Sequence, residues 1–260
     1  MKAASDSNLS KRVTQYLIKH IHDNDLKPGD RVPSEVKVSG ELKISRGVVR
    51  QAYHSLRTAG ILEIAMGRSP RVGELSHDSF TPLFSHALTT AQASIEDVLE
   101  LRVAIEIHAA ELAAIHRTQG HVEALRKAVE GMRKNVKDHD RFARIDVRFH
   151  QLLGNATGNY LFEIFGRALR TPLESSIRTG LRSRETIAQI EKVVDTHEAI
   201  VDAIEEQHQA RARQIMEYHF SEAKQALRAA SKAGRQNISN GPRCDVTPFS
   251  LPGREMIFRF

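Results

Sequence analysis

Four side chains in the C-terminal half of the sequence have the types and spacing of a metal site. Asp146 and His150 stand four residues apart in "RIDVRFHQLL", so they stack on one side of a predicted helix, beside its apolar face. His197 in "VVDTHEAIVDAI" and His219 in "QIMEYHFSEA" lie among apolar residues at helical spacing. Three imidazoles and a carboxylate suit a divalent transition metal, with zinc first and nickel or manganese as alternatives. Two facing helices must then supply His197 and His219.

The same histidines have a simpler explanation as core residues. The chain contains 13 histidines, so some fall on apolar faces by chance. His108 is such a residue, in register with Leu101, Ile105 and Leu112. A single histidine on an apolar face is more often a hydrogen-bonded core residue than a ligand. Spacing alone therefore leaves both interpretations open.

Composition narrows the class of protein. A chain of 260 residues that is 40% apolar has room for about two domains with a sizeable core. No apolar run approaches the ~18 residues of a membrane helix, and the start "MKAASDSNLSKR" lacks the apolar core of a signal peptide. The one cysteine, Cys244, excludes an intramolecular disulfide and a cysteine-based zinc cluster. We therefore expect a cytoplasmic protein that does not enter a membrane.

The basic charge is concentrated at the N-terminal end. Residues 1–77 hold 13 Lys and Arg against 8 Asp and Glu, whereas the remainder holds 25 against 24. A basic module attached to a near-neutral domain is the electrostatic pattern of a nucleic-acid-binding protein. Taken alone, so small a surplus is equally consistent with a solvated surface.

Residues 1–77 have the pattern of a winged helix-turn-helix. "RVTQYLIKHI" has helical apolar spacing, and the Pro-Gly of "LKPGDRVPS" ends that helix. Ser34 and Ser45 are good N-caps for two further helices. "ILEIA", a turn containing glycine, and "RV" then predict a two-stranded ribbon.

Two arginines lie where such a domain reads DNA. Arg46 and Arg50 are one turn apart at the N-terminal end of the third helix, which enters the major groove in a helix-turn-helix. Arginine bonds guanine in a bidentate manner or holds phosphate. Gly67 and Arg68 at the ribbon tip would approach the minor groove. The alternative is that these arginines are solvated surface charges.

Residues 1–77 resemble the DNA-binding domain of the GntR family of bacterial transcription regulators. The resemblance rests on "LKPGDRVPSE", "ISRGVVRQAYHSLRTAGIL" and "GRSPRV", and it implies DNA contact by Ser45 as well as by the arginines. The family usually has an arginine after the Ser-Glu pair, where this chain has Val36. The operator sequence therefore does not carry over, although Lys37 or Lys43 would be placed to contact phosphate instead.

The rest of the chain predicts an all-α helical bundle. Few prolines and glycines interrupt it, and helical periodicity predicts six or seven helices near 81–91, 95–117, 121–136, 139–155, 159–180, 184–207 and 210–232. The predicted fold class is mainly α: a winged helix-turn-helix in 1–77, a linker in 78–94, a helical effector-binding and dimerisation domain in 95–235, and a disordered tail in 236–260.

The helical segment resembles the C-terminal ligand-sensing (FCD) domain of the FadR subgroup of GntR regulators. The matching stretches are "EDVLELRVAIEIHAAELAA", "DVRFHQLL", "HEAIVDAI" and "MEYHF". In the metal-binding branch of that subgroup, an Asp, a His four residues later and two further His hold the ion. The resemblance implies the metal ligands Asp146, His150, His197 and His219.

The same resemblance implies that a small carboxylate effector, an organic or sugar acid, binds beside the metal. Arg102 stands where the family has an arginine that reaches into this cavity, and it would pair with the carboxylate. An internal ion pair with Glu106, one turn away, is the alternative. Ser175 and Arg178, in "TPLESSIR", are further candidates for effector binding.

These observations predict a transcription regulator, a repressor rather than an enzyme, that binds operator DNA as a homodimer. A single helix-turn-helix reads only a half-site, so a two-fold dimer is needed for a palindromic operator. The sequence leaves three other interpretations open: a metal-sensing regulator, a metal-dependent enzyme with a DNA-binding-like head, and a structural metal site in a dimerisation module.

Overall fold

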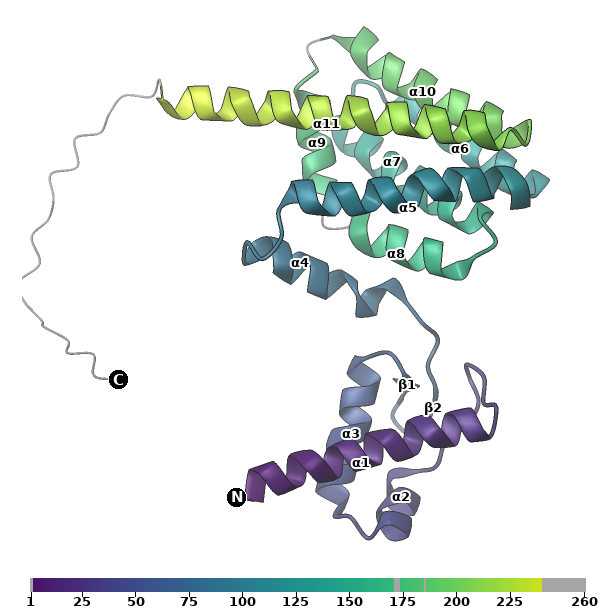
Figure 1. The fold of residues 1–260 in the computed structure, drawn as a ribbon, viewed down its shortest axis with the longest axis vertical. Coiled ribbons are helices and arrows are strands. Elements are labelled where there is room, and N and C mark those ends of the chain that lie inside the picture. Colours follow the sequence, from purple (N-terminus) through teal and green to yellow (C-terminus); the bar gives the residue numbers. More distant parts are fainter. Residues whose placement is uncertain (1, 171–173, 185, 240–260) are drawn as a thin grey trace, which may run out of the picture.

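The N-terminal domain is a small winged helix. The computed structural model describes residues 2–170, 174–184 and 186–239. In this domain helices α1 (Lys2–Asp23), α2 (Glu35–Leu42) and α3 (Arg46–Thr58) are followed by strands β1 (Leu62–Glu63) and β2 (Arg71–Val72) (Figure 1). Leu62 pairs with Val72 in an antiparallel register, and an isolated bridge joins Arg31 to Arg71. The predicted winged helix-turn-helix is confirmed.

Capping and core packing explain why these short elements form. The Ser34 hydroxyl accepts a hydrogen bond from the Lys37 amide at the start of α2, which satisfies one of the free amides of a helix end. Ser45 occupies the N-cap position of α3 without a side-chain bond. The apolar face of α3 packs on α1 and the ribbon in a core made of Val13, Leu17, Val32, Val38, Ile44, Val48, Val49, Ala52, Tyr53, Leu56, Leu62 and Val72.

The C-terminal domain is an all-helical bundle, which confirms the predicted mainly α fold class. After a short 3-10 turn, η1 (His77–Ser79), its helices are α4 (Thr81–Thr89), α5 (Ile95–His116), α6 (Gln119–Lys134), α7 (His139–Ala156), α8 (Tyr160–Arg170), α9 (Glu174–Arg182), α10 (Ile187–Glu205) and α11 (Gln209–Ser239). The long helices α5 and α11 lie side by side, with α7 behind them (Figure 1). In this way α7 is enclosed by neighbours that can bring side chains to it.

The bundle departs from the predicted helices at two places. The single helix predicted over 159–180 is two helices, α8 and α9, and the segment between them, which contains Pro172, lies outside the described residues. Helix α11 continues to Ser239, into the segment predicted as a tail, and residues 240–260 lie outside the described part.

Two capping boxes fix the starts of helices that carry site residues. Ser94 and Asp97 cap α5 reciprocally, and Thr186 and Gln189 do the same for α10. Asp138 accepts a hydrogen bond from the Arg141 amide at the start of α7. Throughout the described ranges, none of the helices combines the length and apolarity that a membrane crossing needs.

Gly154 allows α7 and α8 to approach closely. A Cβ atom built on it would lie 3.1 Å from Glu163 Cα and 3.2 Å from Phe162 O, so backbone atoms of α8 occupy the space that a side chain needs. Gly166, on α8, offers a contrast, because a Cβ there meets nothing within 4 Å.

We expect Gly154→Ala to lower the free energy of unfolding by about 1–3 kcal/mol, because backbone atoms must move to accept the methyl group. Gly166→Ala is the matched control. It should be neutral or stabilising by up to about 1 kcal/mol, since alanine favours the helix and fits the space. Urea unfolding of both variants measures the difference. Equal stability of the two variants would show that the contact between α7 and α8 has no such constraint.

Candidate metal and effector site

Three buried imidazoles from three helices meet at one point. His150 on α7, His197 on α10 and His219 on α11 each bring one ring nitrogen into a group whose members all lie within 4.8 Å of one another. The ring centroids are 5.5 Å apart for His150 and His197, and 4.7 Å apart for His197 and His219. The helices thus bring together three of the predicted metal ligands.

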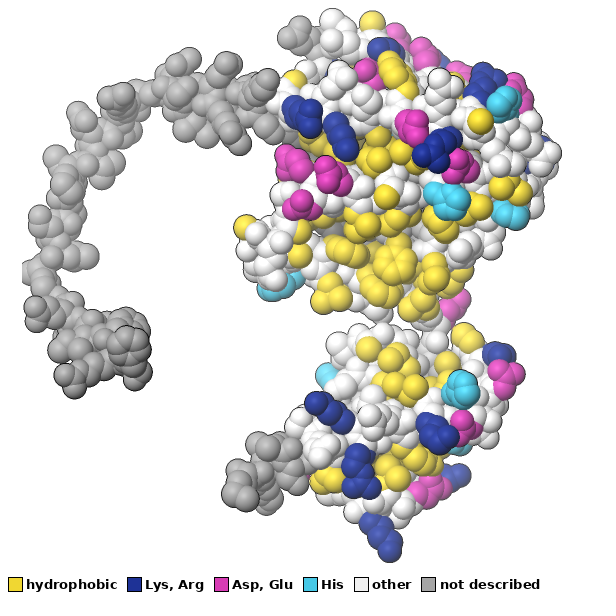
Figure 2. Space-filling model, viewed as in Figure 1, with side chains coloured by type: hydrophobic (Ala, Val, Ile, Leu, Met, Phe, Trp, Pro, Cys, Tyr) yellow, Lys and Arg dark blue, Asp and Glu magenta, His cyan; other side chains and the backbone are white. Residues whose placement is uncertain are grey.

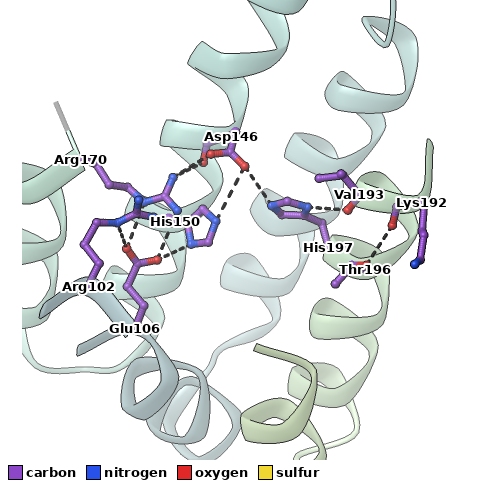
Figure 3. Close-up of polar contacts among 9 residues, drawn as sticks. All are labelled: Arg102, Glu106, Asp146, His150, Arg170, Lys192, Val193, Thr196 and His197. Atoms are coloured by element: carbon purple, nitrogen blue, oxygen red, sulfur yellow. Dashed lines mark hydrogen bonds and ion pairs between the residues drawn. The ribbon is translucent and has the colours of Figure 1, made fainter. Parts of the chain in front are cut away.

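Asp146 places one carboxylate oxygen beside this group. Its Oδ1 lies 3.1 Å from His197 Nε2 and 3.8 Å from His150 Nε2 (Figure 3). Its other oxygen, Oδ2, accepts a hydrogen bond of 2.9 Å from Arg170 Nη1. Asp146 therefore has one oxygen engaged by the protein and one turned toward the imidazoles.

Each of the two innermost histidines also has one nitrogen engaged and one turned inward. His197 Nδ1 lies 2.7 Å from the Val193 carbonyl oxygen, which can accept a hydrogen bond but cannot donate one. His150 Nδ1 lies 2.5 Å from a Glu106 carboxylate oxygen. Protonation of these Nδ1 atoms leaves both Nε2 atoms as bare lone pairs. A histidine ligand of a metal ion is commonly oriented in this way.

The inward-facing atoms fit a metal ion better than they fit each other. Both Nε2 atoms are buried and have no well-aligned hydrogen-bond partner among the residues described, and the contact of His150 Nδ1 with Glu106 is a close contact rather than a well-aligned hydrogen bond. With Nδ1 protonated, His197 Nε2 and Asp146 Oδ1 are two acceptors 3.1 Å apart, which repel unless a cation lies between them. Nitrogen and oxygen donors of this type bind zinc, nickel or manganese.

Burial and charge keep these groups in their metal-binding protonation states. Burial and, next, the Arg170 charge lower the pKa of His150 to about 4. Burial is the main cause, and the neighbouring His197 and His150 the next, that lowers the pKa of His219 well below its ordinary value. Burial, the largest single effect, raises the pKa of Asp146, but Arg170 together with His197 and His150 outweighs it and holds this pKa well below its usual range. His150 and His219 are therefore neutral, and Asp146 is ionised, at neutral pH.

Arg170, at the C-terminal end of α8, organises the site from the side opposite the imidazoles. Besides Asp146, it donates from Nε to Glu106 Oε1 at 3.1 Å. Arg102 donates to the same Glu106 oxygen at 2.8 Å (Figure 3). The two arginines and two carboxylates form a buried quartet in which the formal charges cancel. Sequence reasoning missed Arg170, although a buried arginine near the predicted carboxylate ligand is the expected counter-charge.

A cavity opens beside the imidazoles and contains Arg102. It has about 640 Å³ of empty space, part of it open to solvent, and His219, Asp146 and Arg102 line it. Arg102 also lies over the Phe220 ring, 5.3 Å from its centroid. Its Nε donates to Glu106, the ion pair that was the alternative expected from the sequence. Within the described part of the chain, its terminal nitrogens donate to no group. Arg102 can thus keep this ion pair and still bind a carboxylate.

Of the other predicted effector residues, Arg178 is not brought to the cavity wall. Arg178 pairs with Glu174 at 3.4 Å and with Asp140 at 3.7 Å, and it is absent from the lining. Ser175 lies in α9, but its side chain is outside the described part of the structure. Arg184 lines the cavity instead and donates to the Gly180 carbonyl at 2.7 Å. Arg184 lies just after α9 and was not among the effector residues predicted from the sequence.

The predicted DNA-contacting residues form an exposed set on the winged helix. Ser45, Arg46 and Arg50 lie at the start of α3, and Gly67 and Arg68 lie at the ribbon tip. Gly67 has φ +72°, a conformation that glycine adopts readily. Arg50 is 3.5 Å from a Glu35 carboxylate oxygen with 75% of its side chain exposed, so that pair is weak. Val36, where the resembling family has arginine, is exposed as well.

Comparisons with known proteins agree with both halves of this description. Residues 9–72 match the family model for bacterial regulatory proteins, gntR family, and residues 97–222 match the model for the FCD domain. Curated relatives include the HTH-type transcriptional regulator LutR of Bacillus subtilis (27% identical; 71% of this chain, 85% of the relative) and the HTH-type transcriptional repressor NanR of Cronobacter sakazakii (29%; 76% and 77%). A solved GntR of Streptococcus agalactiae shares the fold, with a TM-score of 0.64 and 23% identity over 84% of this chain and 99% of that one.

The pKa shifts predict that acid destabilises the metal-free protein. The pKa of His150 falls from 6.5 to about 4 on folding, and that of His219 also falls, so the unfolded chain binds more protons between these values. The free energy of unfolding should therefore decrease as pH falls from about 6.5 to 4, by on the order of 3 kcal/mol for His150. The carboxylates add a loss of the same sign below about pH 4.

Urea unfolding of chelator-treated protein at pH 7.5, 6 and 5 measures this dependence. His150→Gln removes one of the titrating groups, and we expect a shallower decrease for it over the same interval. A wild-type stability that stays constant from pH 7.5 to 5 would contradict the assignment of neutral, buried imidazoles.

Removal of a histidine should remove the metal. Protein stripped with chelator and reloaded with zinc should hold about one ion per chain. It should unfold at a higher temperature than the zinc-free protein, because zinc binds the folded state. His219→Ala should lower zinc occupancy and abolish most of that shift. His108→Ala is the control, because His108 is exposed and pairs with Glu111. Full occupancy of a variant lacking both His197 and His219 would exclude this site.

Proposed function

The chain belongs to the gntR family of bacterial regulatory proteins, with an FCD domain behind its DNA-binding domain, and from this premise we propose that it is a repressor released from operator DNA by a small carboxylate bound at a metal ion. The relatives and both families are regulators of transcription rather than enzymes. The single observation that carries the proposal is the convergence of three imidazoles and Asp146 beside a cavity containing Arg102. Operator DNA lies in the bacterial cytoplasm, where the protein would act.

In the proposal the exposed start of α3 reads DNA. Arg46 and Arg50 contact bases or phosphates in the major groove, Ser45 adds a phosphate contact, and Gly67 and Arg68 approach the minor groove. Residues 1–77 form the DNA-binding domain, 78–94 the linker and 95–235 the effector-binding and dimerisation domain. We propose repression because the relative NanR is described as a transcriptional repressor.

In the helical domain Asp146, His150, His197 and His219 would hold zinc, with nickel or manganese as alternatives. The ion supplies a localised positive charge and an open coordination position for a carboxylate oxygen. Arg102 binds the effector carboxylate through its terminal nitrogens. Arg184, and not Arg178, would be the second cationic residue of the cavity. Ser175 remains a candidate for effector binding on the basis of the sequence alone.

A homodimer completes the proposal. A two-fold dimer presents two winged helices to two half-sites, and it needs an apolar contact surface. Figure 2 shows apolar side chains gathered on the face over α5 and α8. Exposed apolar residues of these two helices include Leu101 on α5 with Tyr160 and Leu161 on α8. Burial of such a surface by a second copy would remove it from water.

Helix α8 supplies a physical connection between the cavity and the DNA-binding domain. Its last residue, Arg170, bonds the metal-site carboxylates, while its first residue, Tyr160, donates to the Leu75 carbonyl oxygen at 2.8 Å. Phe165 on α8 contacts Phe80, with ring centroids 5.1 Å apart. A ligand that shifts Asp146 and Arg170 would therefore also shift the chain between the two domains.

The function is tested on DNA selected from a random-sequence pool by the zinc-loaded protein. Organic acids that raise the thermal stability of the protein only in the presence of zinc should weaken DNA binding by about 5–150-fold. Loss of DNA binding on chelation, with no effect of any acid, would favour the metal-sensing regulator instead. Retention of DNA binding under every condition would exclude both kinds of control.

The DNA contact is tested at Arg50. Arg50→Ala should weaken binding to the selected DNA by about 1–3 kcal/mol if the side chain bonds a base in a bidentate manner. Arg57→Ala is the matched control, because Arg57 is an exposed arginine in the last turn of the same helix. Both are measured at one fixed salt concentration, since phosphate contacts depend steeply on salt. Equal affinities of the two variants would remove Arg50 from the interface.

A further inference from the structure

The cavity beside the imidazoles has a few polar groups in a mainly apolar wall. Its ionisable lining residues are Arg102, Asp146, Arg184 and His219. Arg184 and His219 also line a second, more polar depression that adjoins the cavity. The polar part of the lining therefore includes two of the proposed metal ligands, Asp146 and His219.

The remainder of the cavity wall is apolar. Helices α5, α7, α9, α10 and α11 contribute to it, and its larger apolar side chains include Leu99, Phe142, Ile177, Leu181, Val193 and Leu227. Phe142 and Leu181 are buried, and Ile177 is partly buried. These side chains carry no group that can donate or accept a hydrogen bond.

This wall discriminates between two kinds of small carboxylic acid. A sugar acid carries a hydroxyl on almost every carbon, and each hydroxyl buried against aliphatic side chains loses its water without a replacement partner. An alkyl or aryl group of the same length gains from the same burial, by roughly four-fold in affinity for each methylene group. The polar part of the lining meanwhile offers Arg102 and the metal ligands to one carboxylate.

We propose that the effector is a monocarboxylic acid with a compact apolar body, an alkanoate or arylalkanoate, and not a polyhydroxylated sugar acid. The inference rests on the proposed function, because it assigns the carboxylate to Arg102 and the polar part of the lining. It adds that the body of the ligand lies against Phe142, Ile177 and Leu181.

The experiment compares hexanoate with gluconate, two six-carbon monocarboxylates that differ in their hydroxyl groups. Calorimetry with the full-length, zinc-loaded protein also includes acetate, butanoate and phenylacetate. We expect affinity to increase from acetate through butanoate to hexanoate, by roughly four-fold for each added methylene group. Gluconate should bind no more tightly than acetate.

A variant of the apolar wall tests the position of the ligand. Ile177→Asn should weaken hexanoate binding by about ten-fold or more and acetate binding by less than about two-fold, because only the longer acid reaches this side chain. Ile187→Asn is the control, since Ile187 is an exposed residue outside the cavity. It should change neither affinity.

The outcomes separate this inference from the proposed function. Tighter binding of gluconate than of hexanoate, or one affinity throughout the alkanoate series, overturns the apolar ligand class but leaves a carboxylate-controlled regulator intact. Failure of every acid to bind overturns both. An equal loss of acetate and hexanoate binding in Ile177→Asn would also contradict the proposed position of the ligand.

Discussion

The helical domain depends on the hydrogen bonds and ion pairs that the Arg170 guanidinium forms with two buried carboxylates. The guanidinium is almost fully buried and contacts two carboxylates from different helices, Asp146 on α7 and Glu106 on α5. An unpaired charge at such depth is strongly destabilising, whereas a paired and hydrogen-bonded one is tolerated. The three groups therefore fix the relative position of α5, α7 and α8. The same contacts orient Asp146 Oδ1 toward the imidazoles and place Glu106 beside His150.

The charge balance of this quartet explains why the site should attract an anion. Arg102 and Arg170 compensate Glu106 and Asp146, and His150 and His219, whose pKa values are lowered, add no charge at physiological pH. A divalent ion bound at this point would therefore bring two positive charges that the buried quartet does not compensate. A carboxylate in the adjoining cavity would reduce that charge and occupy the open coordination position. Low dielectric in the buried surroundings strengthens the attraction relative to water.

Helical periodicity singled out the candidate ligands, but not the residues that support them. Asp146 and His150 are one turn apart on one helix, and His197 and His219 are on apolar faces, so local spacing made them candidates, and the resemblance to the FCD domain joined them into one set. Arg170 is 24 residues from Asp146 and 64 from Glu106 along the chain, and no local pattern connects them. Likewise, no local pattern connects Arg184 to the cavity residues. Arg178, expected at the cavity, lies instead among the carboxylates Glu174 and Asp140.

The position of Arg170 at the end of α8 limits how a ligand can act on DNA binding. An effector that binds both arrangements of the proposed dimer equally would shift neither, so its contacts must change with the arrangement. Asp146 accepts a hydrogen bond from Arg170, and the opposite end of α8 holds Leu75 through Tyr160. A ligand bound to the proposed metal ion and to Arg102 would act beside Asp146 and on a partner of Glu106 at once. Its binding energy would therefore be directed at the helix that also holds the chain leading to the winged helix, and the same coupling would act in the reverse direction when DNA binds.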